Sequence, residues 1–245
     1  MPSSRPLVFG HRGARGHAPE NTLESFRLAG SMKVDGVEFD VHLSKDGQLV
    51  VIHDDRVDRT TNGSGPVRDF TLARLKELDA GAKSEERWRG ARIPTPAEVF
   101  AEVPGMRYKI ELKHGGSVYP GIEEKLLREI ERAGVKDSVR ITSFDYDALE
   151  RVRSLDRSVE LGMIIHGRAR WFFDAAKKMD ARWLQANYGL LEPKDVALVH
   201  GEGLKVGAWG LAGEGDLRDA IRMGVDDITS DYPDEVLGLL GGPRP

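Results

Sequence analysis

The sequence predicts an α/β fold, and three observations support this class. Short runs rich in β-branched residues alternate with helical patterns along most of the chain, which is typical of βα units that build a parallel sheet. There are about eight such runs, the number that closes a TIM barrel, and 245 residues is a common length for one barrel domain. Polar residues follow several runs directly, where a barrel carries its active site. We therefore expect a TIM (β/α)8 barrel.

The individual elements are identified by their hydrophobic periodicity and by the residues that cap them. The expected barrel strands are residues 7–10, 36–43, 107–113, 138–143, 159–165, 182–187, 204–210 and 225–230. The expected helices are residues 22–32, 120–133, 146–154, 171–179, 193–200, 214–223 and 233–240. Asn21 with Glu24 three residues later forms a capping-box pattern, and Asp145 and Asp231 are placed to cap later helices.

The stretch from about residue 54 to residue 105 interrupts this alternation. It contains a turn-rich segment at 60–66, two short helical patterns and the run Ile93-Pro94-Thr95-Pro96. Loops of this length are usually functional or form a small substructure of their own. We expect a small insertion between the second and third barrel strands, lying over the mouth of the site. No repeat or linker composition divides the chain, so residues 1–245 are expected to form a single domain.

The composition excludes several classes of protein. Hydrophobic residues make up 40% of the chain and charged residues 31%, as in ordinary globular proteins. The net charge of −4 argues against a nucleic-acid binder. The chain has no cysteine, which excludes disulfides, zinc–thiolate sites and cysteine nucleophiles. The first strand begins almost at once and no apolar run reaches transmembrane length, so we expect a cytoplasmic protein without a stable membrane anchor.

Two acidic residues at positions i and i+2 mark the second strand. Strand alternation places Glu38 and Asp40 on one face, and the Asp-Gly turn that follows permits a hairpin. If Leu43 pairs with Gln48, this hairpin places His53 directly opposite Glu38, so that an imidazole joins the carboxylates. Such a group suits a divalent metal with an acid or base beside it, as required for hydrolysis of a phosphate ester.

Two further motifs fall at strand ends. His11 can transfer a proton near neutral pH, and the guanidinium of Arg12 can bind two phosphate oxygens. Glu111 and Lys113 end the third barrel strand and add a third carboxylate and a cation. Charges inside a parallel barrel need partners, so these residues are expected to meet at one end of it. Three carboxylates without a soft ligand indicate Mg²⁺ or Ca²⁺ rather than zinc.

Together, these motifs resemble those of the glycerophosphodiester phosphodiesterase family, in the same order and over nearly the whole chain. The segments that carry the resemblance are His11-Arg12-Gly13, Pro19-Glu20-Asn21-Thr22, Val37-Glu38-Phe39-Asp40-Val41-His42, Lys45-Asp46-Gly47, His53-Asp54, Asp58-Arg59-Thr60-Thr61-Asn62-Gly63 and Glu111-Leu112-Lys113. The resemblance implies a TIM barrel with a small insertion after the second strand. It also implies metal-dependent hydrolysis of small glycerophosphodiesters to sn-glycerol 3-phosphate and an alcohol.

The resemblance further implies a role for each motif residue. These roles are metal ligation by Glu38, Asp40 and Glu111, acid–base catalysis by His11 and His53, and phosphate binding by Arg12 and Lys113. It does not show which histidine is the acid and which the base. Phe144 and Trp209 are further expected to line the pocket, where the indole could face a choline-like cation.

Other readings and positions also bear on function. A lysophospholipase D would use the same site, a cyclising enzyme would release a cyclic phosphate, and a non-catalytic binding module would have lost at least one site residue. His42 shares the face of Asp40 and is the next histidine to test. Asp227 stands where the family usually has glycine, and we expect its effect to be confined to the surface. The sequence predicts neither the headgroup nor the oligomeric state.

Overall fold

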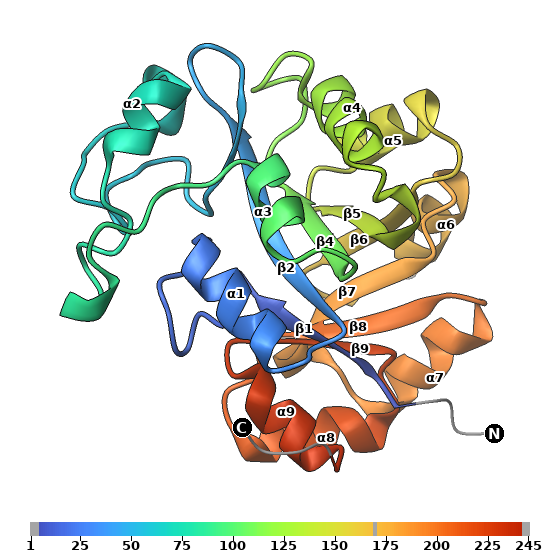
Figure 1. Cartoon of the computed structure of the whole chain (residues 1–245). Coiled ribbons are helices and arrows are strands. Elements are labelled where there is room, and N and C mark those ends of the chain that lie inside the picture. Colours follow the sequence, from blue (N-terminus) through green and yellow to red (C-terminus); the bar gives the residue numbers. More distant parts are fainter. Residues whose placement is uncertain (1–4, 169–170, 242–245) are drawn as a thin grey trace.

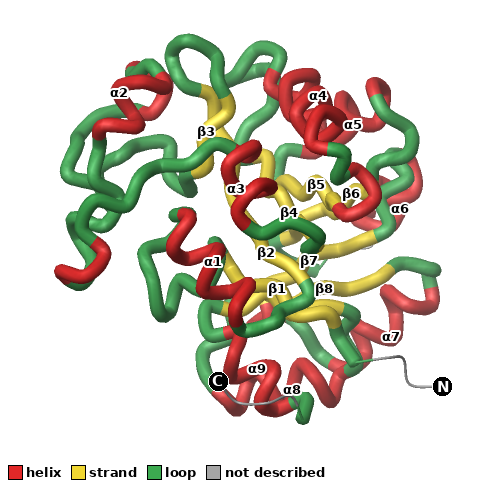
Figure 2. The backbone as a smooth tube through the Cα atoms, viewed as in Figure 1, coloured by secondary structure: helices red, strands yellow, loops and turns green. Residues whose placement is uncertain are grey.

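The protein is described here by a computed structural model that covers residues 5–168 and 171–241. Within these residues, eight parallel strands pair in the order β1-β2-β4-β5-β6-β7-β8-β9, and β9 returns to β1 to close a barrel (Figures 1 and 2). Their bounds are β1 Leu7–His11, β2 Gly36–Leu43, β4 Arg107–Leu112, β5 Val139–Ser143, β6 Glu160–Ile165, β7 Trp183–Asn187, β8 Lys205–Trp209 and β9 Asp227–Ser230. The expected TIM barrel is confirmed.

Helices follow the strands and cover the outside of the barrel (Figure 1). Their bounds are α1 Leu23–Ser31, α3 Pro96–Glu102, α4 Ile122–Ala133, α5 Tyr146–Leu155, α6 Trp171–Lys178, α7 Pro193–Gly201, α8 Glu214–Met223 and α9 Pro233–Leu239. Short 3₁₀ turns lie at η3 Lys136–Ser138 and η4 Tyr188–Leu190. The side chain of Asp145 accepts a hydrogen bond from the Ala148 N–H, so the cap expected at α5 is present.

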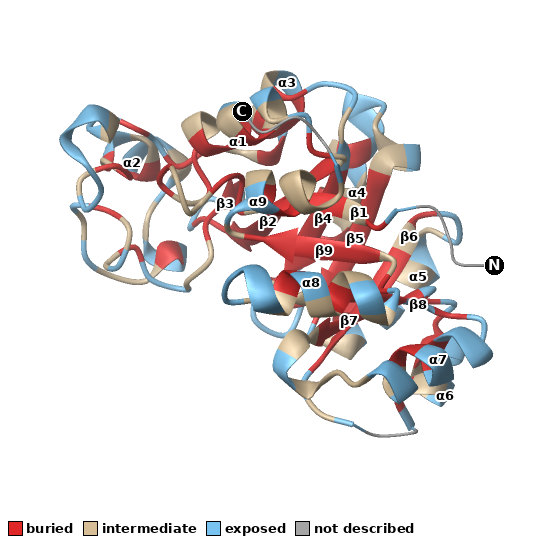
Figure 3. Ribbon diagram, turned by 90° about the horizontal axis from the view of Figure 1, so that it is seen from below, coloured by how far each residue is buried: buried red, intermediate tan, exposed pale blue. Residues whose placement is uncertain are grey.

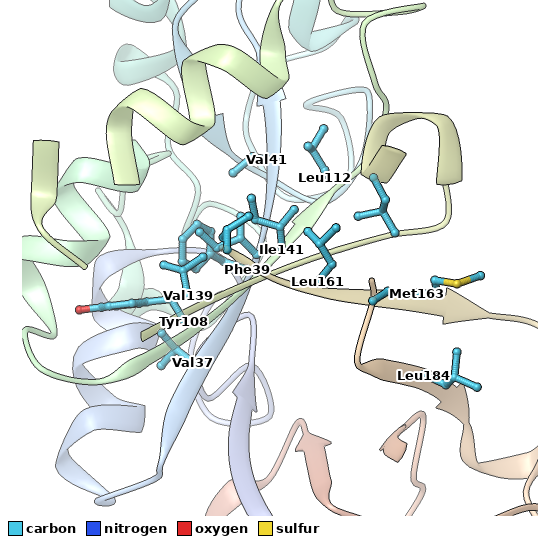
Figure 4. Packing of buried hydrophobic residues seen from close by; sticks show 14 of the residues in the cluster. Val37, Phe39, Val41, Tyr108, Leu112, Val139, Ile141, Leu161, Met163 and Leu184 are labelled. Atoms are coloured by element: carbon cyan, nitrogen blue, oxygen red, sulfur yellow. The ribbon is translucent and has the colours of Figure 1, made fainter. Parts of the chain in front are cut away.

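The main core lies between the strands and these helices. Side chains on the outer face of the barrel strands pack against one another and beneath the helices, as Val37, Phe39, Val41, Leu161 and Met163 show in Figure 4. Burial of each such side chain stabilises the fold by roughly 1.5–3 kcal/mol. The strands are buried on both faces, whereas the outer faces of the helices are exposed (Figure 3). This arrangement leaves the inner face of the barrel for polar residues.

The insertion between β2 and β4 forms a small body of its own beside the barrel (Figure 1). It contains β3 Leu49–Val51, η1 Val67–Asp69, α2 Leu72–Glu77 and η2 Glu86–Trp88. Its separate hydrophobic cluster consists of Val50, Ile52, Val57, Val67, Leu75, Leu78, Ala80 and Ile93. In contrast, Val99 and Phe100 of α3 belong to the main core. The irregular stretch therefore ends at a barrel helix, before residue 105.

The hairpin of β2 and β3 forms as expected, but its register differs by one residue. Leu43 pairs with Leu49 instead of Gln48. The Gly47 N–H donates to the Ser44 carbonyl at 2.9 Å, and the Ser44 N–H donates to the Gln48 carbonyl at 2.9 Å. Because Gly47 adopts a φ of 69°, the loop is a three-residue turn with a glycine bulge rather than a four-residue turn.

The expected pairing of Glu38 with His53 is therefore wrong. A shift of one residue moves every side chain of a strand to the opposite face of the sheet. Strand β3 ends at Val51, and the Ile52 N–H still donates to the Asp40 carbonyl at 3.2 Å. His53 comes after this last backbone–backbone hydrogen bond of the hairpin, so strand pairing no longer decides the direction of its side chain.

Candidate active site

A pocket of about 180 Å³ opens at the carboxyl ends of the barrel strands. Its lining residues are His11, Arg12, Glu38, His53, Lys109, Glu111, Lys113, Thr142, Phe144, Ile164, Gln185, Trp209 and Thr229. Eight of the nine site residues expected from the sequence are among them. The ninth, Asp40, lies just behind the surface and is 1% exposed. The structure thus brings together all of the expected site residues.

Three buried carboxylates form the centre of this site. Glu38 and Asp40 share the inner face of β2, and the register pairs Asp40 with Glu111 on β4. One oxygen from each group lies within 4.8 Å of the others. Burial and the neighbouring charge of Asp40 raise the pKa of Glu38 and of Glu111. The three groups therefore repel one another when all are ionised.

This arrangement fits a divalent cation. Carboxylate oxygens are the preferred ligands of Mg²⁺ and Ca²⁺, and a cation among them would relieve the repulsion. Lys113 Nζ lies 2.7 Å from Glu111 Oε1 and 3.0 Å from Asp40 Oδ1. Asp40 Oδ1 nevertheless has no hydrogen-bond donor in acceptable alignment. Burial opposes ionisation of Asp40, but Lys113 and Arg12 lower the pKa of this carboxyl below its usual range.

Each of the two pocket histidines is paired with an aspartate. His11 Nδ1 lies 2.5 Å from Asp231 Oδ1, and His53 Nδ1 lies 2.6 Å from Asp54 Oδ1. An ionised carboxylate can only accept, so Nδ1 carries the proton and Nε2 is left as the acceptor in the neutral ring. Burial lowers the pKa of both imidazoles, against the opposing effect of the aspartates. Both rings therefore favour the neutral form near pH 7.

Sequence reasoning assigned neither aspartate to a histidine. Asp231 was expected to cap the last helix, which is wrong, because its carboxylate contacts His11 and, at 3.2 Å, Arg15 Nε. Helix α9 begins at Pro233 without a side-chain cap. Local periodicity and cap patterns do not signal this contact, because only barrel closure brings β1 beside β9.

His42, the alternative histidine, does not line the pocket. Its Nε2 donates to the His53 carbonyl at 3.0 Å, and its Nδ1 accepts from the Tyr119 hydroxyl at 2.9 Å. Burial lowers the pKa of His42 to about 4, which keeps the ring neutral. The ring of His42 thus holds the backbone at His53 through this hydrogen bond.

The loop after β1 contributes to the site as well as to the start of helix α1. Asn21 Nδ2 donates to Asp40 Oδ2 at 2.8 Å, and Asn21 has a φ of 57°. The expected capping box at Asn21 is wrong: Thr22 is the N-cap of α1 and accepts from the Ser25 N–H. The Arg12 N–H donates to a Glu38 oxygen at 3.0 Å. Both contacts orient carboxylates of the central group.

The floor of the pocket is charged and buried. Lys109 Nζ donates to Asp227 Oδ1 at 2.7 Å, to Thr229 Oγ1 at 2.8 Å and to Gln185 Oε1 at 2.9 Å. Arg140 donates to the other oxygen of Asp227. Asp227 is 0% exposed, so the expected surface effect is wrong. The position lies inside the barrel, where the carboxylate is the counter-ion of two buried cations.

An aromatic wall completes the pocket. The rings of Phe144 and Trp209 meet edge to face with centroids 6.2 Å apart. Trp209 Nε1 donates to the Gln185 carbonyl at 3.2 Å, which fixes the indole. Phe144 is 46% exposed and offers an apolar surface at the mouth.

Comparison with known proteins identifies the family. The model of the glycerophosphoryl diester phosphodiesterase family matches residues 11–235. The chain belongs to this family. A glycerophosphodiester phosphodiesterase of Caldanaerobacter subterraneus subsp. tengcongensis is 39% identical over 238 residues, which are 96% of this chain and 98% of that protein. One of Bacillus subtilis is 33% identical over 249 residues, covering 94% of this chain and 85% of its own length.

Solved structures of the family agree with this assignment. An Oleispira antarctica phosphodiesterase in complex with the product sn-glycerol-3-phosphate superimposes with a TM-score of 0.93 at 30% identity, covering 97% of this chain and 98% of that chain. A Thermotoga maritima glycerophosphodiester phosphodiesterase gives a TM-score of 0.78 at 28% identity, covering 97% and 99%. The expected enzyme class, a phosphoric diester hydrolase, is confirmed. In the described residues, the helices are too short or too polar to cross a membrane.

Proposed function

We propose that this enzyme hydrolyses glycerophosphodiesters to sn-glycerol 3-phosphate and an alcohol, with a divalent cation bound in the site. The observation that carries the proposal is the group of three buried carboxylates beside two His–Asp pairs in a single pocket. The product bound by the Oleispira antarctica relative supports the choice of substrate.

Glu38, Asp40 and Glu111 are the proposed ligands of Mg²⁺ or Ca²⁺. The cation would supply Lewis acidity, offsetting the charge that builds on the phosphate oxygens during displacement. Lys113 lies against two of these carboxylates, and Arg12 Nε lies 3.5 Å from Asp40 Oδ2. Both cations are therefore within reach of a phosphate held at the carboxylates, and we assign them to phosphate binding.

His11 and His53 are the proposed acid–base pair. In the route we favour, one neutral Nε2 accepts the proton of the glycerol 2-hydroxyl, whose oxygen attacks phosphorus. The other ring, protonated, gives its Nε2 proton to the leaving alcohol oxygen. Water then opens the cyclic phosphate with the two roles reversed. His11 Nε2 lies 3.9 Å from Glu38 Oε2, so this nitrogen faces the phosphate site.

Phe144 and Trp209 are assigned to the alcohol group of the substrate. Their apolar wall lies at the mouth of the pocket, where a leaving group would extend toward solvent. An aromatic face there can also attract a quaternary ammonium group such as that of choline.

A lysophospholipid is the less favoured substrate. Its acyl chain would need an apolar groove beside the phosphate site. An apolar cavity of about 190 Å³ lies between strands β6–β8 and helices α6 and α7. Leu184 and Ala186 line that cavity, whereas Gln185 between them lines the site pocket, so the two spaces lie on opposite faces of β7.

A panel of glycerophosphodiesters tests the proposal. We expect release of sn-glycerol 3-phosphate, loss of turnover in excess chelator, and recovery after addition of Mg²⁺ or Ca²⁺. Full activity in chelator, with metal analysis showing no metal bound, would reject the proposal that the reaction requires a metal. Phosphorus NMR of the products distinguishes full hydrolysis from release of a cyclic phosphate. Lysophosphatidylcholine in the same panel tests the alternative substrate.

Glu111→Gln tests the proposed metal site directly. The substitution removes one charged ligand, so we expect weaker metal affinity in calorimetric titration and lower activity at limiting metal. The metal-free variant should melt no lower than the parent protein, because the repulsion between buried carboxylates is reduced. Unchanged metal affinity would exclude Glu111 as a ligand.

A further inference from the structure

One arginine of the insertion contacts two carboxylates at once. Arg59 Nε and Nη2 donate to Asp54 Oδ2 and Oδ1 at 2.7 and 3.0 Å. Its Nη1 and Nη2 also donate to Glu20 Oε2 and Oε1, each at 2.7 Å. Both edges of the guanidinium are therefore used in forked hydrogen bonds, a geometry that the single ammonium of lysine cannot reproduce.

Each of these carboxylates in turn holds a residue of the site. Asp54 Oδ1 accepts from His53 Nδ1 at 2.6 Å. Glu20 Oε1 accepts from Arg12 Nη1 at 2.7 Å. Arg59 is thus linked through Asp54 to the proposed acid–base histidine, His53. It is linked through Glu20 to the proposed phosphate-binding residue, Arg12.

The bridge joins three parts of the chain that are distant in sequence. Glu20 belongs to the loop after β1, Asp54 follows the β2–β3 hairpin, and Arg59 lies in the insertion. Residues 58–63 are among the segments that match the family pattern, yet the reaction described above does not use them. The contacts of Arg59 give this segment a function.

We propose that Arg59 is a positioning residue that holds both the His53 imidazole and the Arg12 guanidinium in their working orientations. The inference rests on the roles proposed above for those two residues. It also explains why the insertion lies beside the mouth of the barrel: it delivers the arginine that joins the two side chains.

The charge balance supports this inference. Burial would raise the pKa of Glu20, but hydrogen bonds from Arg59 and Arg12 lower it to about 2. Glu20 is shared between the two guanidinium groups, so loss of Arg59 would leave it to Arg12 alone. Asp54 would keep His53 but lose the fork that fixes its carboxylate plane. Both site residues would then gain freedom to rotate.

Substitution of Arg59 tests the proposal with activity as the first readout. We expect Arg59→Gln to lower kcat/KM by about 10–100-fold, the usual cost of losing a residue that orients a ligand or a reacting group. Arg59→Lys should lose nearly as much, because it keeps the charge but not the fork. Arg74→Gln is the matched control: this arginine of α2 pairs with Glu77 on the surface and should leave kcat/KM unchanged.

The two arms of the bridge can be separated. Asp54→Asn should lower kcat through His53, and Glu20→Gln should raise KM through Arg12. Adding Arg59→Gln to the double variant of Asp54 and Glu20 should then cost less than about 3-fold, because residues that act as a unit are non-additive. A purely structural role predicts instead that Arg59→Gln lowers the melting temperature and adds its full loss of activity to that of the double variant.

A measurement that does not depend on turnover tests this inference separately from the proposed function. The His53 ring resonances of the metal-free protein, assigned by their loss in His53→Asn, should shift in Arg59→Gln and stay in place in Arg74→Gln. If no glycerophosphodiester is hydrolysed but the shift is seen, the proposed function fails and the positioning role stands. Unchanged His53 resonances, or unchanged kcat and KM in Arg59→Gln, would overturn the positioning role.

Discussion

His11 and His53 are held by the same kind of contact, although they come from different parts of the chain. In each, Nδ1 is occupied by an aspartate, so only Nε2 is available to a substrate. A fixed tautomer is what a general acid or base needs, because the ring then exchanges a proton at a single known atom. Two such rings in one pocket can serve a reaction that both removes and returns a proton.

Removal of either ring should therefore affect the rate rather than the fold. We expect His11→Ala and His53→Ala each to lower kcat by about 10²–10⁴, the usual contribution of a positioned acid or base. The double variant should lose much less than the product of the two factors. His200→Ala, which removes an exposed ring paired with Asp226, is the control in the same steady-state assay. Near-normal kcat in His53→Ala would reject its role.

The partner of His53 should set the pH range of the reaction. Burial lowers the pKa of His53, and this is partly opposed by the charge of Asp40 and by the hydrogen bond that Asp54 accepts from the ring. Asp54→Asn removes the opposing charge, so the limb of the kcat/KM profile that belongs to His53 should move to lower pH. Movement of the acid limb identifies His53 as the base, and movement of the alkaline limb identifies it as the acid. If neither limb moves, His53 does not titrate in the reaction.

Among the elements, the hairpin shows where local pattern reasoning succeeds and where it fails. Alternation places Glu38 and Asp40 on one face, and the structure agrees. The register depends instead on one backbone angle: Gly47 shortens the loop by one residue and shifts the pairing. His53 still reaches the pocket, because the strand ends before it. His53 therefore lines the pocket without pairing with Glu38, so the expected pairing is not what brings it there.

The elements themselves were predictable because their signals are local. Periodicity and caps lie within about ten residues of the helix or strand that they specify. The contacts of Asp231, Arg59 and Asp227 join residues far apart in sequence, and these contacts exist only after the barrel has closed. A sequence pattern can mark such residues as part of a family motif, but it does not show which atoms they contact.

The insertion should behave as a partly independent body. Leu75 is fully buried in the separate cluster of the insertion rather than in the main core. We expect Leu75→Ala to cost about 2–5 kcal/mol of local stability through lost burial and the cavity left behind. Hydrogen exchange should rise in residues 55–92 while the barrel strands stay protected. An equal rise in both regions would show that the insertion and the barrel unfold together.

The closed barrel as a whole depends on a buried charge balance. Lys109 and Arg140 are each 3% exposed, and both donate to Asp227, which is 0% exposed. Ions taken out of water lose several kcal/mol of hydration, which only close and well-paired contacts offset. A glycine at residue 227 would leave these two cations without this counter-ion. Asp227 and its cations therefore have to be present together.

Asp227→Asn tests this dependence. The amide keeps the shape of the side chain but removes its charge, so we expect a loss of about 3–5 kcal/mol in the free energy of unfolding, measured in urea. Asp226→Asn, at the adjacent half-buried position, should cost only about 1 kcal/mol. In the double variant Lys109→Met with Asp227→Asn, one unpaired cation is gone, and the loss should be clearly smaller than the sum of the single losses. Additive losses would mean that Lys109 and Asp227 do not depend on each other. In that case, water reaching the floor of the pocket would hydrate the lysine and take the place of the counter-ion.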